Sequence, residues 1–110
     1  MATLSLDSRR TALVVVDMQN AFIRDDGSMR KLGLNNDLLK PTVEPVARVV
    51  AAARRAGLPV IFTRMGTRPD YKDSGLRRRR YAEAPRIGSL VLGTWDVAVI
   101  DELTPAPEDY

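Results

Sequence analysis

The sequence predicts an α/β fold built on a parallel sheet. Residues 12–16 and 59–63 are short apolar runs rich in β-branched side chains, the pattern of strands that are buried on both faces. Between them, residues 42–56 carry apolar side chains at helical spacing. A strand, a helix and a second strand in this order form a βαβ unit, in which the strands lie parallel and the crossover is right-handed. We therefore predict a three-layer α/β architecture.

The predicted helix has recognisable ends. Pro41 and Pro45 fall before or within its first turn, where proline is tolerated. Arg54 and Arg55 fall in its last turn, where cations suit the helix dipole, and Gly57 then ends the helix. The apolar positions that recur along it are Val43, Val46, Ala47, Val49, Val50, Ala53 and Ala56.

The remaining segments carry weaker patterns. Residues 23–36 are rich in Gly, Asp and Asn, which indicates a long loop of the kind that is usually functional. Residues 65–85 are polar and basic, and we expect them to be irregular or partly helical. Residues 96–103 fit either a short strand or a helical turn with Val97, Ile100 and Leu103 inward. Residues 104–109 read as a loop leading into a further strand.

Two parallel strands do not make a stable doubly wound sheet, which needs at least three strands and covering helices. At 110 residues, the chain is one domain at most. We therefore expect residues 1–110 to be the N-terminal part of a single larger domain.

The composition narrows the possible chemistry. The chain has no cysteine and no histidine, which excludes disulfides, thiolate metal sites and the usual general base within it. No apolar stretch reaches the roughly 20 residues that span a bilayer, and residues 1–10 lack the apolar core of a secretory signal. We expect a cytoplasmic protein that contacts no membrane.

Asp17 is the residue whose position points to function. It directly follows the first predicted strand, and ligands of open parallel sheets bind beyond the carboxyl ends of the strands. The alternative is that Asp17 only caps the next turn, since aspartate favours turns and helix starts. Position alone does not separate the two interpretations.

Four consecutive arginines, Arg77 to Arg80, carry much of the net charge of +3. Clustered arginines can neutralise the phosphates of a nucleic acid, but only Tyr81 accompanies these and no nucleic-acid-binding module surrounds them. An arginine can also pair with a substrate carboxylate. We favour a solvated face and expect no nucleic-acid partner.

Three stretches carry a family resemblance. Residues 11–22 resemble the opening strand and active-site turn of the isochorismatase-like hydrolases. Residues 57–64 resemble the second strand of that family, and residues 93–105 the segment before its third strand. Within the family, this last segment is most similar to the ureidoacrylate amidohydrolases and related N-carbamoyl amidases. The resemblance implies a Rossmann-like, three-layer parallel sheet, of which this chain supplies the first βαβ unit.

The resemblance also implies a reaction. Family members hydrolyse an amide or ureido C–N bond through a cysteine thioester, using an Asp-Lys-Cys triad. Only the aspartate has a matching position here, Asp17, which would take the thiol proton and return it to the leaving ammonia. The lysine would follow the third strand, just beyond Tyr110, and the cysteine would lie later still. We expect the chain alone to be inactive.

Further site residues are expected near Asp17. Gln19 and Asn20 would hydrogen-bond the substrate or orient the Asp17 loop, and for Asn20 we favour a structural turn. Phe22 would wall the pocket or belong to the core, and Trp95 would line the substrate cavity or cover the sheet edge. Family members with nicotinamide substrates bind zinc through an aspartate and histidines, which this chain cannot provide, so we expect no metal and no cofactor.

The expected partners follow from the missing residues. They are a small amide or ureido substrate and a C-terminal segment or second chain that carries the lysine and cysteine. The complete enzyme is expected to be a homo-oligomer. The alternative is a truncated, non-catalytic domain of the same fold, either a pseudoenzyme or an interaction domain.

Overall fold

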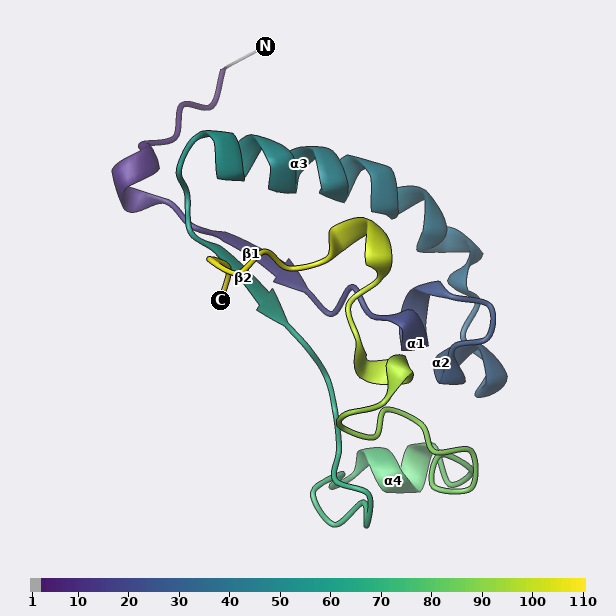
Figure 1. Ribbon diagram of the computed structural model, residues 1–110. Coiled ribbons are helices and arrows are strands. Elements are labelled where there is room, and N and C mark those ends of the chain that lie inside the picture. Colours follow the sequence, from purple (N-terminus) through teal and green to yellow (C-terminus); the bar gives the residue numbers. More distant parts are fainter. Residues whose placement is uncertain (1–2) are drawn as a thin grey trace.

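The computed structural model describes residues 3–110 (Figure 1). Two strands and four α-helices form in this range. They are β1 (Leu13–Val16), α1 (Asn20–Ile23), α2 (Ser28–Lys31), α3 (Val43–Arg55), β2 (Val60–Thr63) and α4 (Arg77–Arg80). Short 3₁₀ turns are Ser8–Arg10, Asn36–Leu38, Lys40–Thr42, Trp95–Val97 and Asp101–Leu103. None of the helices within residues 3–110 is long and apolar enough to cross a bilayer.

The predicted strand–helix–strand unit is confirmed. β1 and β2 pair in parallel, with Val14 opposite Ile61 and Val16 opposite Thr63. α3 connects them and runs alongside the strands (Figure 1). Each of the three elements ends within one residue of its expected bounds, because local apolar spacing and the Gly57 stop set those bounds.

The core lies between α3, the strands and the C-terminal segment. Val50 and Ala53 of α3 pack with Val15 and Val60 of the strands. Ile23, Ile100 and Leu103 complete the cluster, at 4%, 0% and 2% exposure. Residues 96–103 therefore follow the helical-turn alternative: they form two 3₁₀ turns and direct Val97, Ile100 and Leu103 inward.

The expectation that the first strand is buried on both faces is wrong for this chain. Val15 is buried against the core, whereas Val14 and Val16 keep 49% and 63% of their surface exposed. Successive side chains of a strand point to opposite faces, and α3 covers only one of them. Within the described residues, one apolar face of β1 is therefore open to solvent.

The segment expected to be a long loop is more ordered than its composition indicated. Residues 23–36 contain α2, and the buried side chain of Asn36 links the end of the segment to its beginning. Asn36 Nδ2 donates to the carbonyls of Ile23 at 3.1 Å and Arg24 at 3.0 Å. Its Oδ1 accepts from Arg30 Nη1 at 2.6 Å. These hydrogen bonds of a buried amide order the segment. The glycine and aspartate content of the segment does not predict them.

The last residue lies against β2. Tyr110 N donates to Val60 O at 2.9 Å, and Phe62 N donates to Tyr110 O at 2.7 Å. This pair of hydrogen bonds is the pattern of a parallel bridge, so residues 104–109 lead into a strand position on the edge of β2 opposite β1. The C-terminus lies beside the strands in Figure 1.

An ion pair fixes this C-terminal segment to α3. The carboxylate of Asp109 is nearly buried, pairs with Arg54 Nη2 and accepts from the N–H of Ala106 at 2.8 Å. The hydrogen bond from Arg54 holds the pKa of Asp109 below its usual value, with a smaller contribution from the Ala106 N–H. A carboxylate of this kind stabilises the fold only while it is ionised.

We expect the stability of Asp109→Asn to fall less steeply with decreasing pH, below about pH 4, than that of the parent chain. Because the pKa of Asp109 is lower in the folded than in the unfolded chain, its contribution is full above about pH 4 and disappears as the pH falls through the folded-state pKa. Thermal unfolding followed by circular dichroism between pH 7 and pH 2 measures this. Glu108→Gln, at an exposed neighbouring position, should leave the pH dependence unchanged. If the melting temperatures of the parent and of Asp109→Asn fell equally with decreasing pH, the expectation would be contradicted.

Candidate active site

Asp17 lies at the carboxyl end of the sheet, directly after β1. Its backbone N–H donates to Thr63 O at 3.2 Å, and Thr63 Oγ1 donates to Asp17 Oδ1 at 2.7 Å. Within residues 3–110, no hydrogen bond reaches Asp17 Oδ2. The half-buried carboxylate is thus oriented through one oxygen and has no partner on the other.

The backbone of Asp17 adopts a conformation that most residues avoid. Its φ of 55° lies in the left-handed region, which aspartate tolerates better than bulkier side chains. Such conformations cluster at active sites, where the surrounding structure maintains them. The side chain does not cap α1: that helix begins after Gln19 with no side-chain cap, and the carboxylate bonds to Thr63 instead.

Gln19 is fully buried beneath this turn and joins three segments. Its Nε2 donates to Met65 O at 2.8 Å and to Val97 O at 2.9 Å. Its Oε1 accepts from Met65 N at 2.8 Å. Both amide hydrogens and the carbonyl oxygen are therefore engaged by backbone groups from the segments that follow β2 and Trp95. Of its two expected roles, this geometry favours orienting the Asp17 loop.

Asn20 and Trp95 are brought together, but through the backbone of Trp95. Asn20 is buried, and its Nδ2 donates to Trp95 O at 2.8 Å. Trp95 as a whole residue is 53% exposed. Phe22 is half-buried and packs against both apolar clusters of the described residues. The sequence alternatives that Asn20 forms a structural turn and that Phe22 belongs to the core match these placements.

The sequence analysis missed the roles of two polar residues, one at the site and one that joins more distant segments. Thr63 orients Asp17, although its signal was present: it is a polar residue at the carboxyl end of the second strand. Asp96 links distant segments, because it accepts from Ser28 Oγ at 2.6 Å and from Leu90 N at 2.7 Å. Ser28 Oγ also contacts Ser89 Oγ at 2.7 Å. No local sequence pattern predicts the hydrogen bonds of Asp96, because its partner Ser28 lies 68 positions away in the sequence.

The arginine cluster forms α4, in the part of the molecule beyond the carboxyl end of β2 (Figure 1). Arg77 and Arg80 place their guanidinium groups 5.5 and 5.7 Å from the centre of the Tyr81 ring. Arg78 and Arg79 are exposed. None of the four forms a hydrogen bond or ion pair with Asp17 in the described part of the chain. This placement agrees with the solvated face that the sequence favoured.

Metal ligands are not gathered at Asp17. In the range 3–110, no three acidic side chains lie close enough to hold a metal ion together, and the sequence has no histidine or cysteine. The site provides a single oriented carboxylate at the carboxyl end of the parallel strands. Such a group can accept or return a proton.

The chain and its fold match known proteins. Residues 11–110 match the family model of the isochorismatase domain. The ureidoacrylate amidohydrolase of a Methylorubrum extorquens strain is 38% identical over 120 residues, which cover 96% of this chain and 48% of that protein. The corresponding enzyme of Pseudomonas syringae pv. syringae is 35% identical over 121 residues, again 96% of this chain and 48% of that protein.

Solved structures agree with the sequence matches. A cysteine hydrolase from Pseudomonas syringae pv. phaseolicola superposes with a TM-score of 0.76 at 30% identity, covering 97% of this chain and 47% of that one. An N-carbamoylsarcosine amidase from Thermoplasma acidophilum gives a TM-score of 0.61 at 35% identity, covering 90% of this chain and 48% of that one. The chain spans about half the length of the relatives it matches. The resemblance and the fold class expected from the sequence are confirmed, and the chain belongs to the isochorismatase family.

Proposed function

We propose that Asp17 is the catalytic acid/base of a hydrolase that cleaves a C–N bond in a small amide or ureido compound. The observation that carries the proposal is the carboxylate itself, which sits at the carboxyl end of a parallel strand in a left-handed turn. Thr63 holds one of its oxygens and leaves the other available to a proton. The relatives named ureidoacrylate amidohydrolase and N-carbamoylsarcosine amidase support the substrate class.

The proposed reaction needs a thiol that these 110 residues do not contain. A cysteine supplied by the rest of the domain would transfer its proton to Asp17 and attack the carbonyl carbon as a thiolate. The C–N bond then breaks, and Asp17 returns the proton to the departing ammonia. Water hydrolyses the thioester and regenerates the thiol, and a lysine from the same missing part would complete the triad. The chain alone is accordingly proposed to be inactive.

The neighbouring residues take supporting roles in this proposal. Gln19 and Asn20 hold the turn that carries Asp17, because their side chains are buried and bonded to backbone carbonyls. Trp95, which is exposed and whose backbone carbonyl accepts from Asn20, is available to line the substrate cavity. Phe22 supports the turn from the core side.

Complementation tests the function. We define the complemented protein as this chain co-expressed with the second half of the Methylorubrum extorquens ureidoacrylate amidohydrolase, the part beyond the match to this chain. We expect it to release ammonia from ureidoacrylate or an N-carbamoyl amino acid, and we expect neither half to do so alone. Alkylation with iodoacetamide should abolish the release. A correctly assembled complex without hydrolysis of any such compound would contradict the proposal and favour the non-catalytic alternative.

A further inference from the structure

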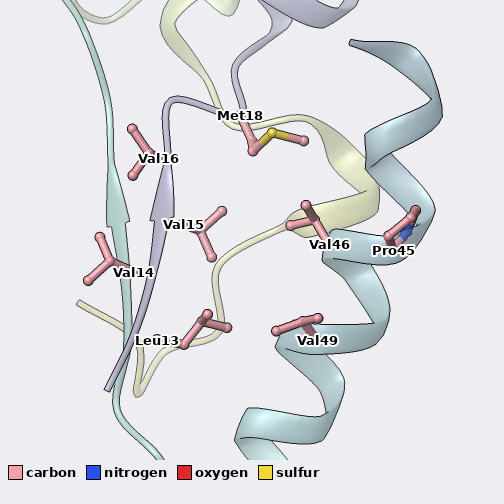
Figure 2. Close-up of a pocket in the computed structure, with 8 residues that line it drawn as sticks. All are labelled: Leu13, Val14, Val15, Val16, Met18, Pro45, Val46 and Val49. Atoms are coloured by element: carbon pink, nitrogen blue, oxygen red, sulfur yellow. The ribbon is translucent and has the colours of Figure 1, made fainter. Parts of the chain in front are cut away.

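A hollow of about 410 Å³ lies between α2 and the turns that follow α4. Three basic residues line it: Lys31 at the end of α2, Arg80 at the end of α4, and Arg86 in the turns. One acidic residue, Glu83, accompanies them. The hollow between β1 and α3 is different, because every residue that lines it is apolar (Figure 2). The hollow beside α2 therefore gathers an excess of positive charge.

Two of the three basic side chains have no acidic partner within residues 3–110. Arg86 Nε pairs with Glu83 Oε2 at 2.5 Å, so the charge of Arg86 is compensated. Neither Lys31 nor Arg80 lies within ion-pair distance of a carboxylate in that range. Arg30, next to Lys31, does have such a partner: its Nη1 lies 3.3 Å from Asp37 Oδ1. The lining thus keeps two uncompensated positive charges.

Tyr81 holds the two sides of the hollow together. It is half-buried and packs against the apolar cluster that contains Met29 of α2. The guanidinium group of Arg80 lies 5.7 Å from the centre of the Tyr81 ring, within the range of a cation–π interaction. Arg77 lies 5.5 Å from the same ring, and its Nη2 contacts Met29 Sδ at 3.6 Å. Packing between α2 and α4 therefore places Lys31 and Arg80 at one hollow.

Main-chain N–H groups in the lining are also without partners. Within residues 3–110, the N–H groups of Ala82, Glu83 and Arg86 donate to no acceptor, whereas that of Ala84 donates to Tyr81 O at 3.0 Å. All three of the residues with a free N–H line the hollow. Backbone N–H groups in turns form anion-binding concavities in many proteins. The turns after α4 can therefore donate hydrogen bonds to an anion beside the basic side chains.

The charge and the size of the hollow favour a phosphate monoester. Such a group carries a charge of about −1.5 to −2 at pH 7, which matches two positive charges better than a single carboxylate does. A guanidinium group bonds phosphate oxygens at two points, and a lysine adds a further donor. The volume falls in the range of small-molecule sites, roughly 300–1,000 Å³, and leaves room for an organic part. Leu32 and Ile87 give the lining apolar surface for that part.

We propose that this hollow binds a small organic phosphate monoester, with Lys31 and Arg80 at the phosphate and Leu32 and Ile87 against the organic part. Such a ligand connects α2 to the turns after α4, so it stabilises the folded chain when it binds. The proposal concerns binding alone. It stands independently of whether Asp17 is catalytic.

An NMR titration of the isotope-labelled chain tests the proposal. The probe is phenyl phosphate at about 0.05 M salt, where surface charges are weakly screened. We expect saturable binding with a Kd of about 1 mM or tighter, and shifts in the amide signals of Ala82, Glu83 and Arg86. Phenol, the same ring without the phosphate, should not bind, and benzoate should bind at least about tenfold more weakly. No saturable shift at these amides, or equal affinity for benzoate, would overturn the proposal.

Three matched substitutions separate the hollow from the arginine cluster as a whole. Lys31→Gln and Arg80→Gln each remove one of the two uncompensated charges and should weaken binding by at least about tenfold. Arg79→Gln makes the same change in charge at an exposed residue outside the lining, and affinity should change by less than about twofold. Equal weakening by Arg79→Gln and Lys31→Gln would show a general attraction and overturn the assignment.

Lys31→Gln keeps the test decisive if Arg80→Gln disturbs α4. Within residues 3–110, the side chain of Lys31 forms no ion pair, so its replacement breaks no such contact of the fold. Circular dichroism of each variant verifies the helices. A folded Lys31→Gln chain that binds phenyl phosphate with the parental Kd would overturn the proposal.

A lipid headgroup presents the same phosphate chemistry on a membrane surface. Co-sedimentation with vesicles of phosphatidic acid and phosphatidylcholine distinguishes this source from a small molecule. We expect the chain to stay in the supernatant at about 0.15 M salt, because the hollow has room for a whole small ligand. Pelleting that Lys31→Gln abolishes and Arg79→Gln preserves would assign the hollow to a lipid headgroup and overturn the small-molecule assignment.

Discussion

Asp17→Asn should lower the turnover of the complemented protein by at least about 100-fold, the usual effect of removing a positioned acid/base. The asparagine side chain has nearly the same shape, and its carbonyl oxygen can still accept from Thr63 Oγ1. Asparagine also tolerates the left-handed backbone of this position. The variant therefore keeps the fold and loses only the proton acceptor. Steady-state release of ammonia measures the change, which should fall on kcat with little effect on KM.

Two comparisons make this result specific. Asp26→Asn alters an exposed carboxylate in the loop after α1 and should retain the parental rate. Thr63→Val removes the hydroxyl that orients Asp17 while leaving the carboxylate, so its loss should be smaller than that of Asp17→Asn. If Asp17→Asn folds normally and turns over substrate at the parental rate, Asp17 is not the acid/base.

The parts of the fold that follow from short stretches of chain were predictable. The bounds of β1, α3 and β2 depend on apolar spacing and on stop signals within a few residues of each end. The position of Asp17 follows from the same information, because it needs only the end of the first strand. Its chemical role remains a prediction from that position and from the family.

Features that depend on distant partners were not predictable. Gln19 bonds to Met65 and Val97, which lie 46 and 78 positions away, so its buried role has no local signal. The same holds for Asp96 and Ser28. Continuous apolar character in β1 indicated burial on both faces, yet Val14 and Val16 are exposed here. An apolar run shows that a face needs cover and does not show which segment provides it.

Gln19→Leu should lower the free energy of unfolding by about 3 kcal/mol or more. Leucine is of similar volume, but it leaves Met65 N, Met65 O and Val97 O without the hydrogen bonds they now make. A buried polar group without a partner costs about 1–3 kcal/mol. Urea denaturation of the chain, followed by circular dichroism, measures the change. Asn35→Leu, the same kind of replacement at an exposed position, should cost no more than about 1 kcal/mol.

The same variant decides between the two roles expected for Gln19. If Gln19 orients the Asp17 loop, its loss lowers stability and kcat together, because the turn that carries the carboxylate is no longer tied to the segments after β2 and Trp95. If Gln19 instead bonds the substrate, the loss raises KM and leaves stability near that of the parent. A stability loss below about 1 kcal/mol would therefore reject the orienting role, since all three of its buried backbone partners would then have found other hydrogen bonds at no cost.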